Sequence, residues 1–250
     1  MVGSHRPRPS TARRSVRSET CGAGEAELAW IAADRGLAAA RQTGDPVVTG
    51  SLFRSVTHAL LSTGRFVEAV QLTDQAAGHL ESALSRPTPE LLSTYGTLFL
   101  AGSMAAARAN DAGTTRTFLT AADDAARRLG RDANHVWTAF GPTNVAIHRV
   151  ATAAELGDVQ VAIDLGPRVD TSALPTERRV RHALEVARAL STWNRTDDAL
   201  TMLLEAEQIA PEQVRYHFLS RQLVLTWIRQ QRTKPSTSLV DLAKRLKVLD

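Results

Sequence analysis

The chain has 250 residues, of which 43% are hydrophobic and 22% are charged, an ordinary globular composition that excludes wholesale disorder. Its single cysteine, Cys21, excludes an internal disulfide and is typical of a reducing cytoplasm. We expect no signal peptide, and no apolar run reaches the roughly 18–20 residues of a membrane-spanning helix. The sequence therefore predicts a cytoplasmic protein without a membrane partner.

The formal net charge of the chain is +4, from 30 Lys and Arg against 26 Asp and Glu. Residues 1–20 hold five arginines against Glu19, so this segment carries the whole excess and residues 21–250 sum to zero. Residues 1–25 also lack helical periodicity, which predicts a disordered basic tail ahead of a folded domain over 26–250. Because the excess belongs to the tail, it does not indicate a folded face that binds nucleic acid.

Apolar residues recur at helical spacing from about residue 26 nearly to the end of the chain, and 39 alanines favour helix further. Gly, Pro and Asn break this pattern at intervals that suit single helices and are too long for single strands. The sequence predicts an all-α fold of eleven helices, over residues 26–42, 47–62, 66–84, 90–109, 112–129, 133–156, 159–168, 176–192, 196–209, 212–231 and 237–248.

Small residues follow the predicted turns at fixed offsets. Ala69 lies five positions after Gly64, Ala199 lies five after Asn194, and a further alanine follows each of them seven positions later. Gly and Asn tolerate the left-handed backbone that ends a helix, and only a small side chain fits where two helices cross closely. The pattern resembles tetratricopeptide repeats and predicts a right-handed α-solenoid of four to five tetratricopeptide-like helical hairpins. The turns recur unevenly, and an alanine-rich bundle would give some of the same matches, so a bundle remains an alternative.

A closer resemblance covers residue 25 to about residue 248. Its most specific parts are FGPTNVAIHR (140–149) and LPTERR (174–179), with AELAWIAADRGLAAARQTGDP before them and LVDLAKRLKV after them. These stretches resemble the C-terminal half of bacterial regulators of the xenobiotic-response-element type. In that family a helix-turn-helix DNA-binding domain precedes a tetratricopeptide-like sensor or interaction domain. The resemblance implies the sensory half of a transcriptional regulator.

A helix-turn-helix domain needs roughly 55–65 residues, whereas only about 25 unpatterned residues precede the first predicted helix. We therefore expect the DNA-binding domain to be missing, through a misplaced start, gene decay or design. The segment LVDLAKRLKVLD resembles the first helix of a helix-turn-helix, but no recognition helix follows it, so we interpret it as a terminal cap. This chain alone is expected to bind no specific nucleic-acid sequence.

The sequence carries no motif for catalysis. No glycine-rich phosphate loop ends in Gly-Lys-Ser/Thr, and the seven histidines show neither an HExxH motif nor the spacing of a zinc site. Adjacent carboxylates such as Asp197 and Asp198 point to different faces of a predicted helix. We predict that the protein is not an enzyme and has no catalytic residues, cofactor or metal.

The tetratricopeptide register instead places polar side chains on the concave face of the predicted solenoid. Guanidinium groups hold carboxylates in bidentate pairs, and an Asn side chain can bond both the N–H and the C=O of an extended peptide. The predicted ligand-binding residues are Arg54, His58, Asn144, Arg181, Arg188, Arg215 and Gln222. Two alternatives remain: the arginines are solvated or ion-paired within the chain, and Thr143 or Asn144 merely caps a helix.

These observations predict a non-enzymatic helical-repeat sensor or interaction domain of a transcriptional regulator. Its concave groove would bind a peptide, a small anionic ligand or a protein partner. One alternative is a regulator that acts on DNA through a truncated or separate helix-turn-helix. The other is a protein–protein scaffold with no small ligand. A homodimer is also left open.

Overall fold

The computed structural model describes residues 35–36, 38, 43–230 and 234–249. Over these ranges the chain is helical without strands, and only an isolated bridge joins Ala133 to Phe140, so the predicted all-α class is confirmed. The predicted tail over 1–25 and most of the predicted helix over 26–42 lie outside the described residues. None of the described helices combines the length and the apolar character that crossing a bilayer requires.

The described α-helices are α2 (Pro46–Ser62), α3 (Phe66–Leu80), α4 (Pro89–Arg108), α5 (Ala112–Leu129), α6 (Pro142–Glu155), α7 (Val159–Leu165), α8 (Thr176–Thr192), α9 (Thr196–Ile209), α10 (Pro211–Tyr216), α11 (Phe218–Gln230) and α12 (Thr237–Arg245). Short 3₁₀ turns lie at η1 (Glu81–Ser85), η2 (His135–Trp137) and η3 (Gly166–Arg168). The predicted ranges of α2, α4, α5, α8 and α9 agree with the structure to within one residue at each end.

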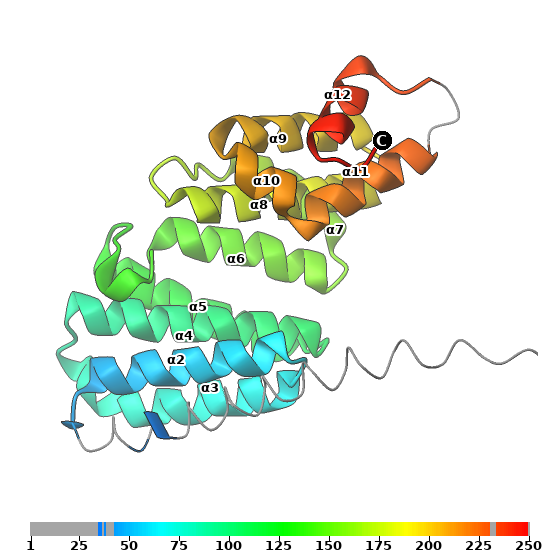
Figure 1. The fold of residues 1–250 in the computed structure, drawn as a ribbon. Helices are drawn as coiled ribbons and strands as arrows, with labels where there is room; N and C mark the ends of the chain where they lie inside the picture. The colour runs from blue at the N-terminus through cyan, green and yellow to red at the C-terminus, as the bar shows by residue number, and fades with distance from the viewer. Residues whose placement is uncertain (1–34, 37, 39–42, 231–233, 250) are drawn as a thin grey trace, which may run out of the picture.

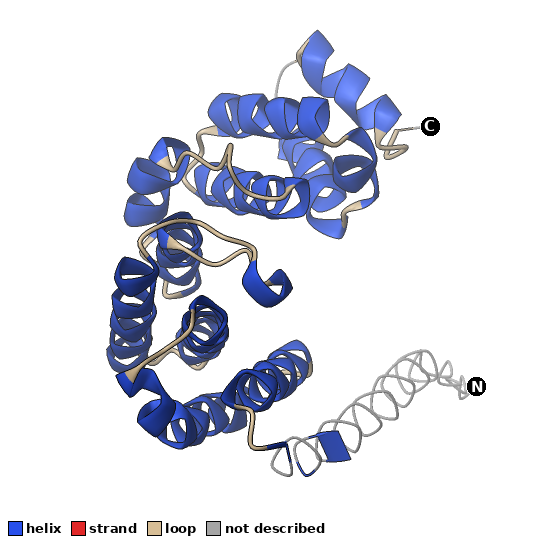
Figure 2. Ribbon diagram, turned by 90° about the vertical axis from the view of Figure 1, so that its left-hand side faces the viewer, coloured by secondary structure: helices blue, strands red, loops and turns tan. Residues whose placement is uncertain are grey.

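The helices run back and forth in two layers that follow a curved arc (Figures 1 and 2). In Figure 1, α2, α4 and α6 lie in front of α3, α5 and α7, whereas α10 and α11 lie in front of α8. Each helix packs on the next one along the chain, and alternate helices also pack on one another, α2 on α4, α4 on α6 and α6 on α8. The layer of α2, α4 and α6 lies on the inside of the arc in Figure 2.

The turns between paired helices have the backbone that the sequence predicts. Gly64 and Asn194 both have a left-handed φ, of 78° and 59°. Ala69 and Ala199, five positions later, are each 0% exposed. A larger side chain at these positions would push the paired helices apart, which is the reason for an alanine at this offset.

The prediction of one helix over 133–156 is wrong in its first part, because α6 begins only at Pro142. Proline has a fixed φ and disfavours helical backbone in the residue before it, so a helix cannot run smoothly through Gly141 into α6. Asp132 instead caps α6: its carboxylate accepts hydrogen bonds from the backbone N–H (3.0 Å) and the hydroxyl (2.6 Å) of Thr143.

The loop over residues 131–141 is anchored on α4 and displays an aromatic ring. Phe140 is 0% exposed and packs over Gly96, in the middle of α4, where a side chain would occupy the space of the ring. Val136 and Trp137 have left-handed φ values of 50° and 58°, and the indole of Trp137 is exposed. The loop therefore has an unfavourable left-handed backbone at Val136 and Trp137, while the packing of Phe140 holds its C-terminal end on α4.

The prediction of one helix over 212–231 is also wrong, because the chain breaks at His217 and forms α10 and α11. His217 has extended backbone, with φ −71° and ψ 130°. The hydroxyl of Ser220 donates to the carbonyl oxygens of Val214 and His217, and Nδ1 of His217 accepts from the N–H of Leu219. At the break, the side chains of Ser220 and His217 therefore form hydrogen bonds with backbone groups that an unbroken helix would pair with one another. Helical periodicity in the sequence does not reveal this local competition.

Candidate functional site

Five basic side chains on the concave face influence one another's ionisation, and we call them the basic cluster. They are Arg54 and His58 from α2, His148 from α6, and Arg178 and Arg181 from α8. These helices are remote from one another in the sequence; α6 packs on α8, whereas α2 packs on α3 and α4.

Two arginines, Arg54 on α2 and Arg178 on α8, have lowered pKa values. Burial lowers the pKa of Arg54 below its ordinary value, and the positive charge of Arg178 lowers it further. Burial also lowers the pKa of Arg178, an effect that Glu177 opposes and Arg181 reinforces.

Two histidines lie in the same positive field. His58 is exposed on α2, and its pKa is lowered to about 4 by desolvation first and then by the charges of Arg54, Arg178 and Arg181. Burial likewise lowers the pKa of His148 to about 4, against a hydrogen bond to Asn144 that favours the charged form. Both imidazoles are therefore neutral at pH 7.

The hydrogen bond of His148 determines which nitrogen carries its proton. Nδ1 lies 2.9 Å from the carbonyl oxygen of Asn144, which can only accept, so Nδ1 donates. The neutral ring then has an unprotonated Nε2 that can accept a proton.

The cluster has little compensating negative charge. Nε of Arg54 is buried without a hydrogen-bond partner, and Arg54 forms no ion pair with any described residue. Glu177 is the carboxylate paired within the cluster, 3.6 Å from Nε of Arg178 and 3.5 Å from Nε of Arg181. Three guanidinium charges therefore face one carboxylate at neutral pH.

Asn144, one of the predicted ligand-binding residues, lies near the start of α6, one turn before His148. It is 1% exposed, and its Nδ2 donates to the carbonyl oxygen of Ala139 at 3.0 Å, so it ties α6 to the loop before it. Its Oδ1 is buried without a partner among the described residues. The contacts assign Asn144 a structural role, and they differ from the helix-capping alternative because Asp132 supplies the cap.

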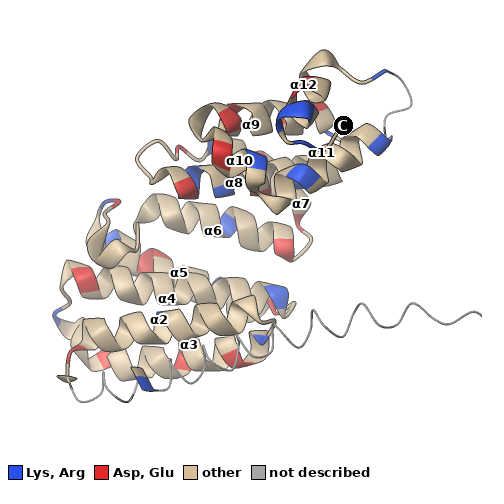
Figure 3. Cartoon of the chain, in the orientation of Figure 1, with Lys and Arg blue, Asp and Glu red and all other residues tan. Residues whose placement is uncertain are grey.

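Arg188, also predicted to bind ligand, is engaged in ion pairs within the chain. Its guanidinium lies 2.8 Å from Glu185 and 3.5 Å from Glu155. Figure 3 shows that acidic and basic residues occur together on α8 and on α10. Arg188 is therefore ion-paired within the chain, which is one of the alternatives that the sequence left open for the predicted arginines.

Arg215 and Gln222 lie apart from the basic cluster. Arg215 pairs through Nε with Oε1 of Glu207 at 3.1 Å, and Arg245 of α12 binds the same carboxylate in a bidentate pair at 2.9 and 2.6 Å. Glu207 is only 7% exposed, so this triad joins α9, α10 and α12. Gln222 is exposed on α11, and no contact connects its side chain to the cluster within the described residues.

The sequence analysis missed Arg178 and His148, although each lies one turn from a residue that it chose. Arg178 precedes Arg181 by three positions, and His148 follows Asn144 by four, which places both on the same helix face as their neighbours.

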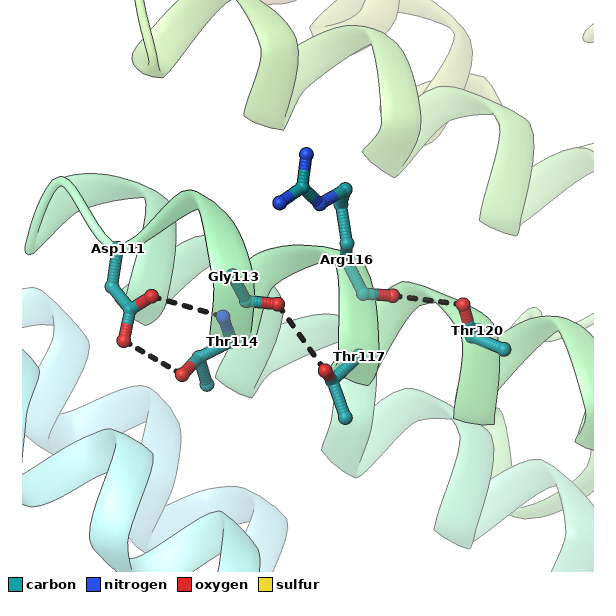
Figure 4. A pocket seen from close by; sticks show the side chains of 6 residues that line it. All are labelled: Asp111, Gly113, Thr114, Arg116, Thr117 and Thr120. Atoms are coloured by element: carbon teal, nitrogen blue, oxygen red, sulfur yellow. Dashed lines mark hydrogen bonds between the residues drawn. The ribbon is translucent and has the colours of Figure 1, made fainter.

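A surface hollow of about 740 Å³ lies elsewhere, at the start of α5 (Figure 4). Asp111 accepts from the N–H and the hydroxyl of Thr114, and the hydroxyls of Thr117 and Thr120 donate to carbonyls of their own helix. These local bonds use the polar groups to hold the helix, so we assign no site to this hollow despite its size. A second hollow of about 370 Å³ lies between the 131–141 loop and residues 173–175.

No three side chains of the His, Cys, Asp and Glu types come together as a metal site within the described part of the chain. Comparisons with protein-family models, with curated proteins and with solved structures gave no match.

Proposed function

We propose that the protein is a non-enzymatic helical-repeat sensor or interaction domain that binds an anionic ligand, a small molecule or a peptide, at the basic cluster. The observation that carries this proposal is Arg54. Its guanidinium projects from α2 with a buried, unpartnered Nε and stands in the field of Arg178 on α8.

Holding like charges together without a partner costs free energy in the unliganded protein. An anion between them would remove the repulsion and satisfy donors that water reaches poorly. Guanidinium groups present paired N–H donors that match carboxylates and phosphates, which makes arginine well suited to this role.

The proposed architecture is a right-handed solenoid of tetratricopeptide-like hairpins. Support for it comes from the left-handed turns at Gly64 and Asn194, from the buried alanines that follow them, and from helices that pack mainly on neighbours. Solenoids use their concave face for binding. The resemblance to bacterial regulators would give such a sensor a role in transcription, with a protein partner receiving its state.

A second candidate function is a protein–protein scaffold without a small ligand. Trp137 is 88% exposed on an anchored loop, and Tyr216 and Phe218 are 73% and 77% exposed on either side of the break at His217. Exposed aromatic side chains are frequent anchors of protein interfaces.

The test is ligand-induced stabilisation by a panel of mono-, di- and polyanions, measured by thermal unfolding and then by calorimetry. The Arg54→Gln variant should bind the best anion at least about tenfold more weakly, since one charge-assisted hydrogen bond contributes about 1.5–3 kcal/mol. The matched control is Arg195→Gln, which removes an arginine paired with Asp198 on the surface. Equal binding by both variants, or no binding by the parent protein, would refute the proposal and leave the scaffold.

A further inference from the structure

We propose that a second copy of this chain binds at the 131–141 loop, with Trp137 of each copy inserted into the hollow beside the loop of the other. The hollow has a volume of about 370 Å³ and lies between this loop and residues 173–175. The indole and the hollow are neighbours on one surface, as a pair of contacts related by a twofold axis requires. The hollow is lined by no residue of the basic cluster, so this interface is independent of the proposed anion site.

The side chain of Trp137 is the most exposed large hydrophobic side chain of the described residues, at 88%. Burial of an aromatic ring is one of the largest single contributions to an interface, and an exposed ring forgoes it. Tryptophan is also enriched among the residues that contribute most to binding between proteins. The exposure of this ring therefore points to a contact outside the molecule.

The loop that displays the indole is ordered by bonds at its ends and near its tip. The N–H of Ala133 donates to the carbonyl oxygen of Phe140 at 2.9 Å. Oδ1 of Asn134 accepts from the N–H of Ala139 at 3.0 Å. Nδ1 of His135 lies 3.2 Å from a carboxylate oxygen at the start of α4. A partner would therefore meet a prearranged surface and would have few groups left to order on binding.

The backbone beneath the indole is strained. Val136 and Trp137 have φ values of 50° and 58°, which cost free energy for residues that carry a Cβ. The ring that this backbone displays is exposed, so its packing within the described chain does not compensate for the strain. Strained backbone of this kind clusters at binding sites.

The hollow has the chemistry that an indole needs. Its walls are formed mainly by small or apolar residues, Ala133, Ala139, Ala173, Leu174 and Pro175. Its volume lies within the roughly 300–1,000 Å³ of pockets that hold small molecules, so one aromatic side chain fits. Asp132 and Asn134 also line it, and each of their bonded oxygens accepts one hydrogen bond and keeps a lone pair. The indole N–H is a donor only, and it lies on the positive edge of the ring, which suits this acceptor-lined, negatively charged hollow.

The size of the contact corresponds to a weak dimer. An aromatic side chain buries about 150–250 Å², so two indoles and comparable areas of two hollows give roughly 600–1,000 Å² in total. Stable interfaces bury about 1,200–2,000 Å², and transient ones bury less. We therefore expect a monomer–dimer equilibrium with a Kd between roughly 1 µM and 1 mM.

The experiment is sedimentation equilibrium of the full chain over roughly this range of concentrations. The expected result for the parent protein is a reversible monomer–dimer equilibrium. Trp137→Ala should weaken the dimer by at least about thirtyfold, because both indoles leave the interface. The matched control is Trp193→Ala, which removes an indole that is 54% exposed at the end of α8 and should dimerise as the parent does.

A mixture of two variants tests whether the indole enters the hollow. Ala173→Phe places a ring in the hollow at an exposed position, so it should fold and dimerise as weakly as Trp137→Ala. An equimolar mixture of the two variants restores one of the two contacts. The intact indole of the Ala173→Phe chain then meets the open hollow of the Trp137→Ala chain. The mixture should associate at least about tenfold more tightly than either variant alone.

The outcomes separate the dimer from the anion site. A parent protein that stays monomeric over the whole range, or a dimer that Trp137→Ala leaves unchanged, would overturn the proposal. A mixture that associates no better than its components would overturn the insertion of the indole into the hollow. Arg54→Gln should dimerise as the parent does, and a loss of the dimer in this variant would overturn the independence of the two sites.

Discussion

A methyl group added to Gly96 tests how tightly the 131–141 loop is anchored on α4. A Cβ at this position would lie 2.5 Å from Cε1 of Phe140 and closer still to Cζ and Cε2. Carbon atoms in contact are about 3.5–4.0 Å apart, and Phe140 is 0% exposed, so the ring must move inside a filled core. Such overpacking costs about 1–3 kcal/mol or more, while alanine in place of glycine in a helix gains about 0.5–1 kcal/mol.

Gly96→Ala should therefore lower the free energy of unfolding by about 2 kcal/mol, which for a chain of this size corresponds to a fall in Tm of about 4–8 °C. Circular dichroism during heating measures it. The matched control is Gly78→Ala on the exposed side of α3, where a Cβ meets nothing within 4 Å, and its Tm should rise. Gly96→Ala combined with Phe140→Leu should lose less stability than the two single variants together. A Gly96→Ala protein as stable as the Gly78→Ala protein would refute the packing argument.

Three further changes test other features. Hydrogen bonding to Arg245, and then to Arg215, lowers the pKa of Glu207 in the folded state, so its stabilisation is present at neutral pH and lost as the pH falls through that lowered value. Glu207→Gln should thus destabilise the protein by about 1–3 kcal/mol at pH 7 and by clearly less at pH 3, as measured by urea unfolding. Asp132→Ala removes the cap of α6 and should cost about 1 kcal/mol; an unchanged urea midpoint would contradict the assignment. Val136→Asn should raise the free energy of unfolding by about 1 kcal/mol, because asparagine tolerates left-handed backbone better than a β-branched residue, and a fall in Tm would show that the isopropyl group matters more than the backbone.

The helical part of the fold was predictable because its signals are local. Turn residues such as Gly64 and Asn194 end helices through their own backbone preference. The alanines five positions after them lie where two helices cross closely, and the fixed offset in the sequence predicts that position. The failures lie where a long-range contact or a side chain overrides periodicity. Phe140 fixes a loop on α4, and Ser220 helps to break a helix that its apolar spacing would continue.

The candidate site was predictable only in part, because a groove depends on the rotation of each helix as well as on its existence. On α8, Leu184 follows Arg181 by three positions as Arg178 precedes it by three, yet Leu184 is 1% exposed in the core, and apolar spacing alone does not reveal this difference. The pairing of Arg188 with Glu155 of α6 also depends on how neighbouring helices stack. No spacing along one helix contains that information.

The stacking of α2 on α4, α4 on α6 and α6 on α8 makes the groove an elastic element. The two walls that carry Arg54 and Arg178 are linked through three helix interfaces in series, so small rotations at each interface add up at the ends. A ligand that draws the walls together would increase the curvature of the whole arc with little strain at each helix interface. A mutation at any one interface would change the distance between the walls in the unliganded protein. The outer helices pack on the inner ones, so a change in the curvature of the arc would also rearrange the convex surface.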